Sequence, residues 1–95
     1  MGYYTKYDIS PQFGEGVPDW SEFLNVVTEI SGYADPFEDS CNWYDHEEDM
    51  LKISARFPEV EWVLDGEGEE SGDIWRKTFK NGAMLSNKKA KIVFD

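Results

Sequence analysis

The sequence predicts one α+β domain over residues 1–95, with the element order β-α-β-α-β-β-β and a mostly antiparallel sheet that carries two helices on one face. Three observations predict this class. Two segments with apolar residues at helical spacing each follow an acidic capping sequence. Segments near both ends of the chain alternate apolar and polar residues, as half-buried strands do. Asn81-Gly82 is a dipeptide typical of two-residue hairpin turns.

The N-terminal part is expected to form a strand followed by a helix. Alternation along residues 3–9 predicts the strand, and Ser10-Pro11 is expected to end it. Asp19 and Glu22 form a capping box that predicts the start of the helix, and Gly32 supplies a left-handed position for its end. The core-facing stripe of this helix consists of Trp20, Phe23, Leu24, Val27 and Ile30.

A second helix is predicted between an acidic loop and Pro58. The loop covers residues 33–40, and residues 41–44 are expected to form a short strand after it. Asp45 and Glu48 form a second capping box, with acids in the first turn and bases near the end, which the helix dipole favours. The apolar face of this helix consists of His46, Met50, Leu51, Ile53, Ala55 and Phe57.

The C-terminal part is expected to supply the remaining strands. Residues 60–64 alternate with period two, and the polar run 65–72 is expected to be a connection. A strand over residues 74–80 leads into the hairpin turn. Ser86-Asn87 interrupts the alternation on the return, and residues 90–94 resume it as a closing strand.

The charge of the chain is unevenly distributed. The net charge is −11, and the first 50 residues hold twelve acidic residues with Lys6 as their only base. A surplus confined to one half indicates a binding partner. The hydrophobic share of 40% and the aromatic share of 16% indicate a folded chain instead of a disordered acidic tail. Anionic lipid and bare nucleic acid repel such a charge, so neither is an expected partner.

Cys41 is the only cysteine, which excludes an intramolecular disulfide and favours a reducing compartment. The sequence has no apolar segment of signal-peptide or membrane-spanning length. We therefore expect a soluble, cytoplasmic protein.

No catalytic residue, metal or cofactor is predicted. Cys41 and His46 are close in the sequence, yet the surrounding carboxylates raise a thiol pKa and oppose a reactive thiolate. Two alternatives from other classes stay open. One is a small-ligand-binding or enzymatic cleft near Cys41, His46 and Trp75. The other is RNA binding by the basic C-terminal strands, with Arg76, Lys77, Lys80, Lys88, Lys89 and Lys91.

The acidic segment 35–49 contains no Lys or Arg and is the predicted partner-binding surface. Duplex DNA presents about one charge per 1.7 Å of its axis, so carboxylates spread over a few helical turns can occupy a phosphate-binding groove on another protein. Interleaved aromatic residues are expected to anchor the contact. An acidic face that only solubilises the protein is the alternative. The predicted surface consists of Asp35, Glu38, Asp39, Trp43, Tyr44, Asp45, Glu47, Glu48 and Asp49.

A second acidic loop is expected to add to this surface. Its oxygen-bearing residues have the alternate spacing of a calcium loop, but Glu70 and Arg76 occupy the places that require Gly and a bidentate Glu. A solvated loop is therefore expected instead of a metal site. The loop contains Asp65, Glu67, Glu69, Glu70 and Asp73.

Two stretches, residues 41–50 (CNWYDHEEDM) and 66–77 (GEGEESGDIWRK), together with the Gly-Tyr-Tyr-Thr start at residues 2–5, resemble a family of small, mostly uncharacterised proteins of bacteriophages and mobile elements. The likeness covers roughly residues 40 to 95 and this start. Thr78 and Ala83 depart from the family pattern, which has an aromatic and a basic residue there. The segment 10–39 has no counterpart in the family.

This resemblance implies a phage origin, and small acidic proteins in that setting are often inhibitors of host defence, including anti-restriction and anti-CRISPR proteins. The expected function is therefore non-enzymatic: the acidic, DNA-mimic-like surface binds a host nucleic-acid-binding protein or nuclease complex in the bacterial cytoplasm.

Overall fold

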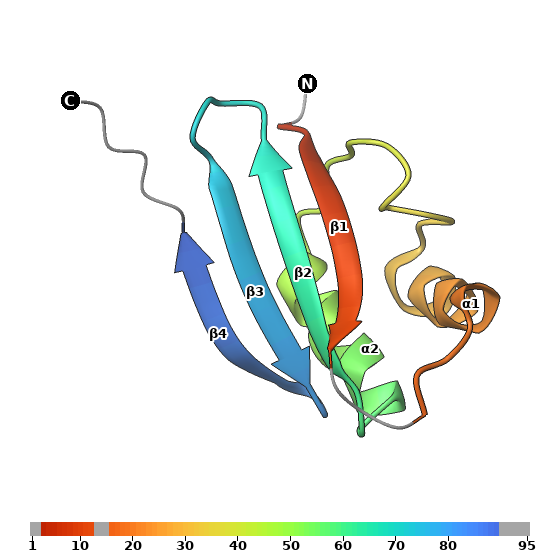
Figure 1. Cartoon of the computed structure of the whole chain (residues 1–95). Helices are drawn as coiled ribbons and strands as arrows, with labels where there is room; N and C mark the ends of the chain where they lie inside the picture. The colour runs from red at the N-terminus through yellow and green to blue at the C-terminus, as the bar shows by residue number, and fades with distance from the viewer. Residues whose placement is uncertain (1–2, 13–15, 90–95) are drawn as a thin grey trace.

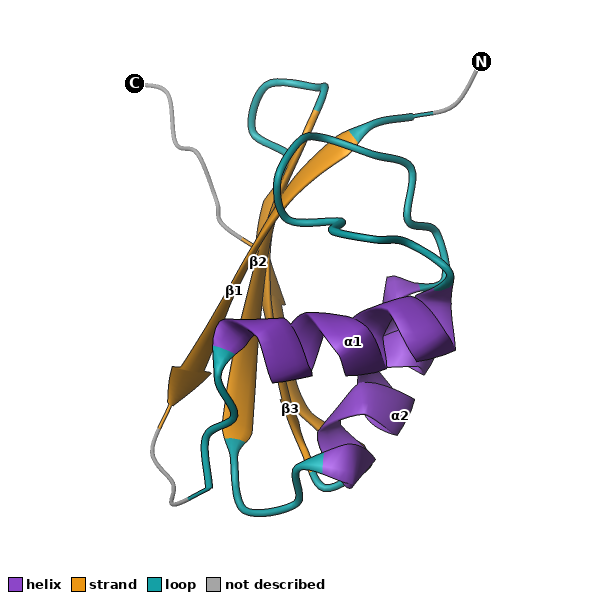
Figure 2. Ribbon diagram, turned by 90° about the vertical axis from the view of Figure 1, so that its right-hand side faces the viewer, coloured by secondary structure: helices purple, strands orange, loops and turns teal. Residues whose placement is uncertain are grey.

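The computed structural model describes residues 3–12 and 16–89. Within them, four antiparallel strands form one sheet in the order β1-β2-β3-β4, and two helices cover one face of it (Figures 1 and 2). This arrangement confirms the predicted α+β class. The elements are β1 (Thr5–Gln12), α1 (Trp20–Ser31), α2 (His46–Arg56), β2 (Glu61–Gly68), β3 (Ile74–Lys80) and β4 (Ala83–Lys89).

Helix α1 begins and ends where its caps predict. The Asp19 carboxylate accepts a hydrogen bond of 2.8 Å from the Glu22 N–H, and Gly32 has the left-handed φ of 84° that ends the helix. Phe23 is buried and stacks on Trp62 of β2, with ring centroids 4.4 Å apart. This contact fixes α1 to the sheet, whereas Trp20 in the first turn stays half exposed.

Helix α2 lies against β3 and β4. It starts at His46 as expected, but the Asp45 side chain forms no capping hydrogen bond, so the second capping box is not made. Met50, Ile53 and Ser54 form its buried face. The Ser54 hydroxyl accepts the Gly82 N–H at 3.0 Å and so connects the helix to the β3–β4 turn.

The connection between the helices differs from the prediction. The expected strand over residues 41–44 is absent, and only Cys41 pairs with Thr5, through two backbone hydrogen bonds of 2.9 and 3.0 Å. Strand β1 also continues past Ser10-Pro11 to Gln12. An edge strand tolerates Pro because only one of its sides belongs to the ladder. The expected closing strand over residues 90–94 lies outside the described residues.

Strand β2 extends through the first half of the segment 65–72, which was expected to be a loop, and it ends at Gly68. The glycines here are not turn residues. A Cβ at Gly66 would overlap the Trp75 ring, and a Cβ at Gly68 would overlap the side chains of Tyr3 and Asp73. Both positions therefore make room for a neighbouring side chain within a regular strand.

The hairpin between β3 and β4 confirms the Asn81-Gly82 prediction. Asn81 has φ 47° and Gly82 has φ 79°, so both central residues are left-handed, as a type I′ turn requires. A β-bulge opposite Thr78 and Phe79 inserts one residue into β4. This bulge explains why the alternation is interrupted at Ser86-Asn87.

Candidate protein-binding surface

Tyr3 joins the two acidic segments of the chain. Its backbone N–H donates to the Tyr44 hydroxyl at 2.8 Å, and its own hydroxyl donates to the Asp73 carboxylate at 2.6 Å. The Glu70 N–H donates to the same Tyr3 hydroxyl at 3.1 Å. The hydrogen bond to Asp73 raises the pKa of the Tyr3 hydroxyl, which therefore stays a neutral donor. Tyr3 thus connects Tyr44 to residues 70–73.

The resulting surface carries exposed aromatic side chains among carboxylates. Tyr44 is 64% exposed and Tyr4 is 46% exposed. The Tyr4 N–H donates to the Glu69 carboxylate at 3.1 Å, which places Tyr4 beside this loop. We call this surface the acidic end, and it consists of Tyr4, Tyr44, Asp45, Glu69, Glu70 and Asp73.

Strand register and a backbone bridge assemble the acidic end. Thr5 pairs with Gly68 at the end of the β1–β2 ladder, so Tyr3 and Tyr4 meet the loop that follows β2. The Thr5–Cys41 bridge holds the loop between the helices at the same end of β1. Glu38 and Asp39, both exposed, shortly precede Cys41 and extend the acidic surface along this loop.

Four carboxylates of the predicted surface have partners within the domain. Asp35 accepts the Phe37 N–H, and Asp49 accepts the Trp43 indole N–H at 2.8 Å. Glu47 pairs with Lys77 at 2.9 Å, and this hydrogen bond lowers the pKa of the Glu47 carboxyl. Glu48 is exposed and lies 3.7 Å from Lys52.

Trp43 does not belong to the surface, so its expected role as an interface anchor is wrong. It is 1% exposed and packs edge-on against Tyr7, with ring centroids 5.4 Å apart. Trp43 was assigned to the surface because its neighbours in the sequence are acidic. The sequence argument did not select Tyr3 and Tyr4. Tyr3 makes the hydrogen bonds that join the two segments, and Tyr4 exposes an aromatic ring. Only the pairing of β1 with β2 brings these two residues to the surface loop, and this pairing cannot be read from one sequence.

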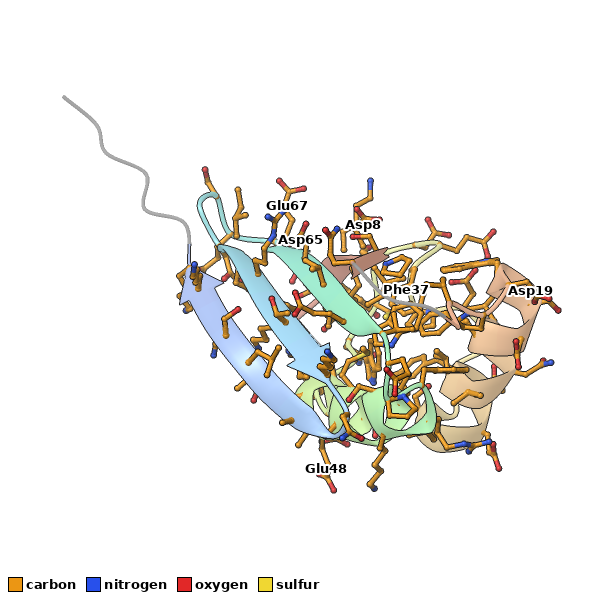
Figure 3. All side chains as sticks on the ribbon, turned by 60° about the horizontal axis from the view of Figure 1, so that its bottom comes forward. Asp8, Asp19, Phe37, Glu48, Asp65 and Glu67 are labelled. Atoms are coloured by element: carbon orange, nitrogen blue, oxygen red, sulfur yellow. The ribbon has the colours of Figure 1, made fainter. Side chains whose placement is uncertain are left out.

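The predicted acidic residues do not form one continuous patch. Figure 3 shows Glu48 on the opposite side of the molecule from Asp65 and Glu67. Asp65 lies in β2 and forms a bidentate pair with Arg76 of β3, at 2.7 and 3.0 Å. Asp65 and Glu67 alternate with the helix-facing residues of β2. They therefore lie on the face of the sheet that the helices do not cover, which we call the open face.

The open face has a hollow of about 710 Å³ beside these residues. Ile74 is its exposed apolar side chain. Charges of both signs from all four strands line the hollow, so it has no single charge preference. The charged residues of the lining are Lys6, Asp8, Asp65, Glu67, Arg76, Lys88 and Lys89.

The structure does not bring Cys41 and His46 into a catalytic pair. Both ring nitrogens of His46 are engaged, Nδ1 with the Trp43 carbonyl oxygen at 2.9 Å and Nε2 with Lys77 Nζ at 2.7 Å. The Cys41 Sγ faces the Pro36 carbonyl oxygen at 3.7 Å, and burial raises the pKa of this thiol. His46 does meet Trp75, because the two rings stack at 4.9 Å. Of the three residues named for a cleft, Trp75 also lines the hollow described above.

Among the described basic residues of β3 and β4, Lys80, Lys88 and Lys89 are exposed, whereas the other two have acidic partners. Arg76 is held by Asp65, and Lys77 is buried beside Glu47. Trp75 is 8% exposed and Phe79 is fully buried, so neither ring offers a stacking platform for bases. Lys91 lies outside the described residues.

Comparisons with protein-family models, curated proteins and solved structures find no match to this chain. The resemblance to phage proteins therefore stays a prediction. Among residues 3–12 and 16–89, no group of three or more His, Cys, Asp and Glu side chains is placed to hold a metal ion. No helix in this part of the chain is long and apolar enough to span a membrane.

Proposed function

We propose that this protein is a non-enzymatic inhibitor that binds a nucleic-acid-binding protein of a bacterial host through its acidic end. The observation that supports the proposal is the exposure of Tyr44 and Tyr4 between carboxylates from two distant segments. Aromatic side chains supply binding energy in interface centres, and charges steer a basic partner into register. The inhibitor would act by stoichiometric occupation of a phosphate-binding groove. Its site of action would be the bacterial cytoplasm.

Asp45, Glu69 and Glu70 are the charges we expect to replace phosphates. All three are exposed, and the structure gives their side chains no basic partner within the described residues. Glu47 and Asp49 are less available, because Glu47 pairs with Lys77 and Asp49 accepts the indole N–H of the buried Trp43. The Glu69 carboxylate accepts only the exposed Tyr4 N–H. Restricting the surface in this way refines the predicted set without changing its chemistry.

Affinity capture from a bacterial lysate over a salt series tests the proposal. We expect a nucleic-acid-binding protein to be retained, to be released by raised salt, and to be displaced by duplex DNA. The Glu69→Lys, Glu70→Lys double variant should lose this partner. A matched control is Glu22→Lys with Glu59→Lys, which makes the same change of net charge on exposed residues away from the acidic end.

If both double variants lose the partner to the same extent, overall charge, and not this surface, attracts it. A captured protein that duplex DNA does not displace would contradict occupation of a nucleic-acid groove. Tyr44→Ala supplies a charge-neutral check, because an anchoring ring should matter at constant net charge.

A further inference from the structure

The two edges of the sheet differ in how they are protected. At the β1 edge, Thr5 is paired with Cys41, and Pro11 lacks a backbone N–H to offer to another strand. At the opposite edge, β4 has no backbone partner on its outer side within the described residues. Six of the seven β4 residues are exposed. The free edge is thus a template for an additional strand.

The regular part of this edge is Ser86–Lys89. The bulge inserts its extra residue nearer to the hairpin turn, and from Ser86 onward β4 pairs residue by residue with β3. Along a regular antiparallel strand, alternate residues turn their N–H and C=O groups away from the paired neighbour. Ser86–Lys89 therefore presents free donors and acceptors to an incoming chain.

The charge of the free edge is opposite to that of the whole domain. No acidic residue occurs between Ile74 and Lys89. Arg76 and Lys77 have carboxylate partners on β2 and α2, whereas Lys88 and Lys89 form no ion pair with any described residue. Lys88 is opposite Arg76 and Lys89 is opposite Trp75, so the two lysines project from opposite faces of the sheet.

We propose that β4 accepts an extended acidic segment of a partner protein as a fifth strand. Main-chain hydrogen bonds would form along Ser86–Lys89, as in other cases of strand addition. Because Lys88 and Lys89 are consecutive, two consecutive acidic residues of the partner would lie opposite them. Met84 and Leu85, which are 41% and 54% exposed, offer apolar contact beyond the bulge.

A second copy of this chain fits the edge less well. Pairing two β4 edges would bring Lys88 and Lys89 of both copies to one joint. It would also bring together two domains that each have a net charge of −11. An acidic strand neutralises the same lysines, so charge complementarity selects it.

The test uses a blocked heptapeptide, Thr-Val-Thr-Glu-Glu-Val-Thr, and the backbone amide spectrum of the full chain. We expect the peptide to shift the amides of residues 84–89. The Lys88→Glu, Lys89→Glu variant should weaken binding at least tenfold. Lys52→Glu with Arg56→Glu, on exposed positions of α2, is the matched control and should leave binding unchanged.

Two further ligands separate strand addition from charge attraction. The same peptide with a methyl group on every backbone nitrogen has no N–H donor on either edge, so it cannot form the ladder and should not bind. A peptide with Lys in place of both Glu residues should bind at least tenfold more weakly. Equal binding of either ligand would overturn the proposal, as would no shift with the original peptide, because the lysines would then only protect the edge.

Two other occupants would be recognised in the same experiment. If the amides of residues 84–89 change with protein concentration alone, a second copy occupies the edge. If a single-stranded oligouridylate shifts these amides more strongly than the acidic peptide does, a nucleic acid is the ligand. Either result would overturn the proposal that an acidic strand is the ligand of this edge.

Discussion

His46 and Lys77 share a hydrogen bond of 2.7 Å between the imidazole Nε2 and the ammonium Nζ. Lys77 is only 9% exposed, and its Nζ also lies 2.9 Å from the Glu47 carboxylate and 4.2 Å from the centre of the Trp75 ring. An ammonium group can only donate, so Nε2 must accept. The His46 Nδ1 therefore carries the proton and donates it to the Trp43 carbonyl oxygen.

This geometry makes the stability of the domain depend on pH. Burial, aided by the Lys77 charge, lowers the folded-state pKa of His46 below 6.5. The hydrogen bond to the Trp43 carbonyl and, less strongly, the charges of Glu47 and Asp49 oppose the shift. Of the aromatic rings beside the imidazole, Tyr7 is the titratable one, and burial raises its pKa to about 12, so it stays neutral. Because the unfolded chain binds the proton more readily, stability is full above pH 6.5 and falls as the pH drops through the folded-state value.

The free energy of unfolding in urea, measured between about pH 7.5 and 5, checks this prediction against His46→Gln. The difference between the two proteins should shrink as the pH falls, since the variant lacks this titration. An NMR midpoint for the His46 ring above 6.5 would show that the imidazolium is tolerated, and the proposed hydrogen-bond arrangement would then be wrong.

Local signals were sufficient for α1 and the hairpin. Asp19 and Gly32 mark the two ends of α1 and Asn81-Gly82 marks the turn, and the structure confirms both elements. The strand pairing could not be predicted in this way. It depends on which distant segments share a face, and therefore on long-range packing.

Two of the errors in the sequence analysis have a common physical cause. Gly66 and Gly68 suggested a loop, but they make room for Trp75 and for Tyr3. Trp43 was assigned to an acidic surface, but it fills the core. In each case the deciding partner is an aromatic side chain from a distant segment. Such a partner cannot be predicted from composition or periodicity.

Substitutions at Trp43 and at the adjacent Tyr44 should have different effects, the first on stability and the second on partner binding. Trp43→Ala is expected to cost about 3–5 kcal/mol of unfolding free energy, because it empties a core position and leaves Asp49 without its indole donor. Tyr44→Ala should cost less than about 1 kcal/mol and should weaken partner capture. Chemical unfolding checks both, with Trp43→Phe as the milder variant if Trp43→Ala does not fold. Similar stability losses at the two positions would contradict the assigned burial.

Gly82 should be needed for its backbone conformation and not for lack of space. A Cβ at this position would lie 3.6 Å from the Ala55 Cβ, which is an ordinary contact, whereas its φ of 79° disfavours side chains. Gly82→Ala is expected to cost about 1–2 kcal/mol. Gly82→Asn should cost less, because Asn tolerates left-handed backbone. If the Gly82→Asn variant has a lower melting temperature than the Gly82→Ala variant, the left-handed turn conformation is not the cause of the destabilisation.

Gly66 should be needed for space, because the Trp75 ring occupies the volume of its missing side chain. Gly66→Ala is expected to destabilise the domain by about 1–3 kcal/mol through overpacking. For a domain of this size, each 1 kcal/mol lowers the melting temperature by about 4–8 °C. The Trp75→Leu background supplies the control, since a smaller side chain leaves room for the new methyl group. In a double-mutant cycle the two substitutions should therefore couple, and Gly66→Ala should cost markedly less beside Leu. Additive costs would mean that Ala at this position strains the β2 backbone independently of the ring, and the close packing of Trp75 on β2 would lose its support.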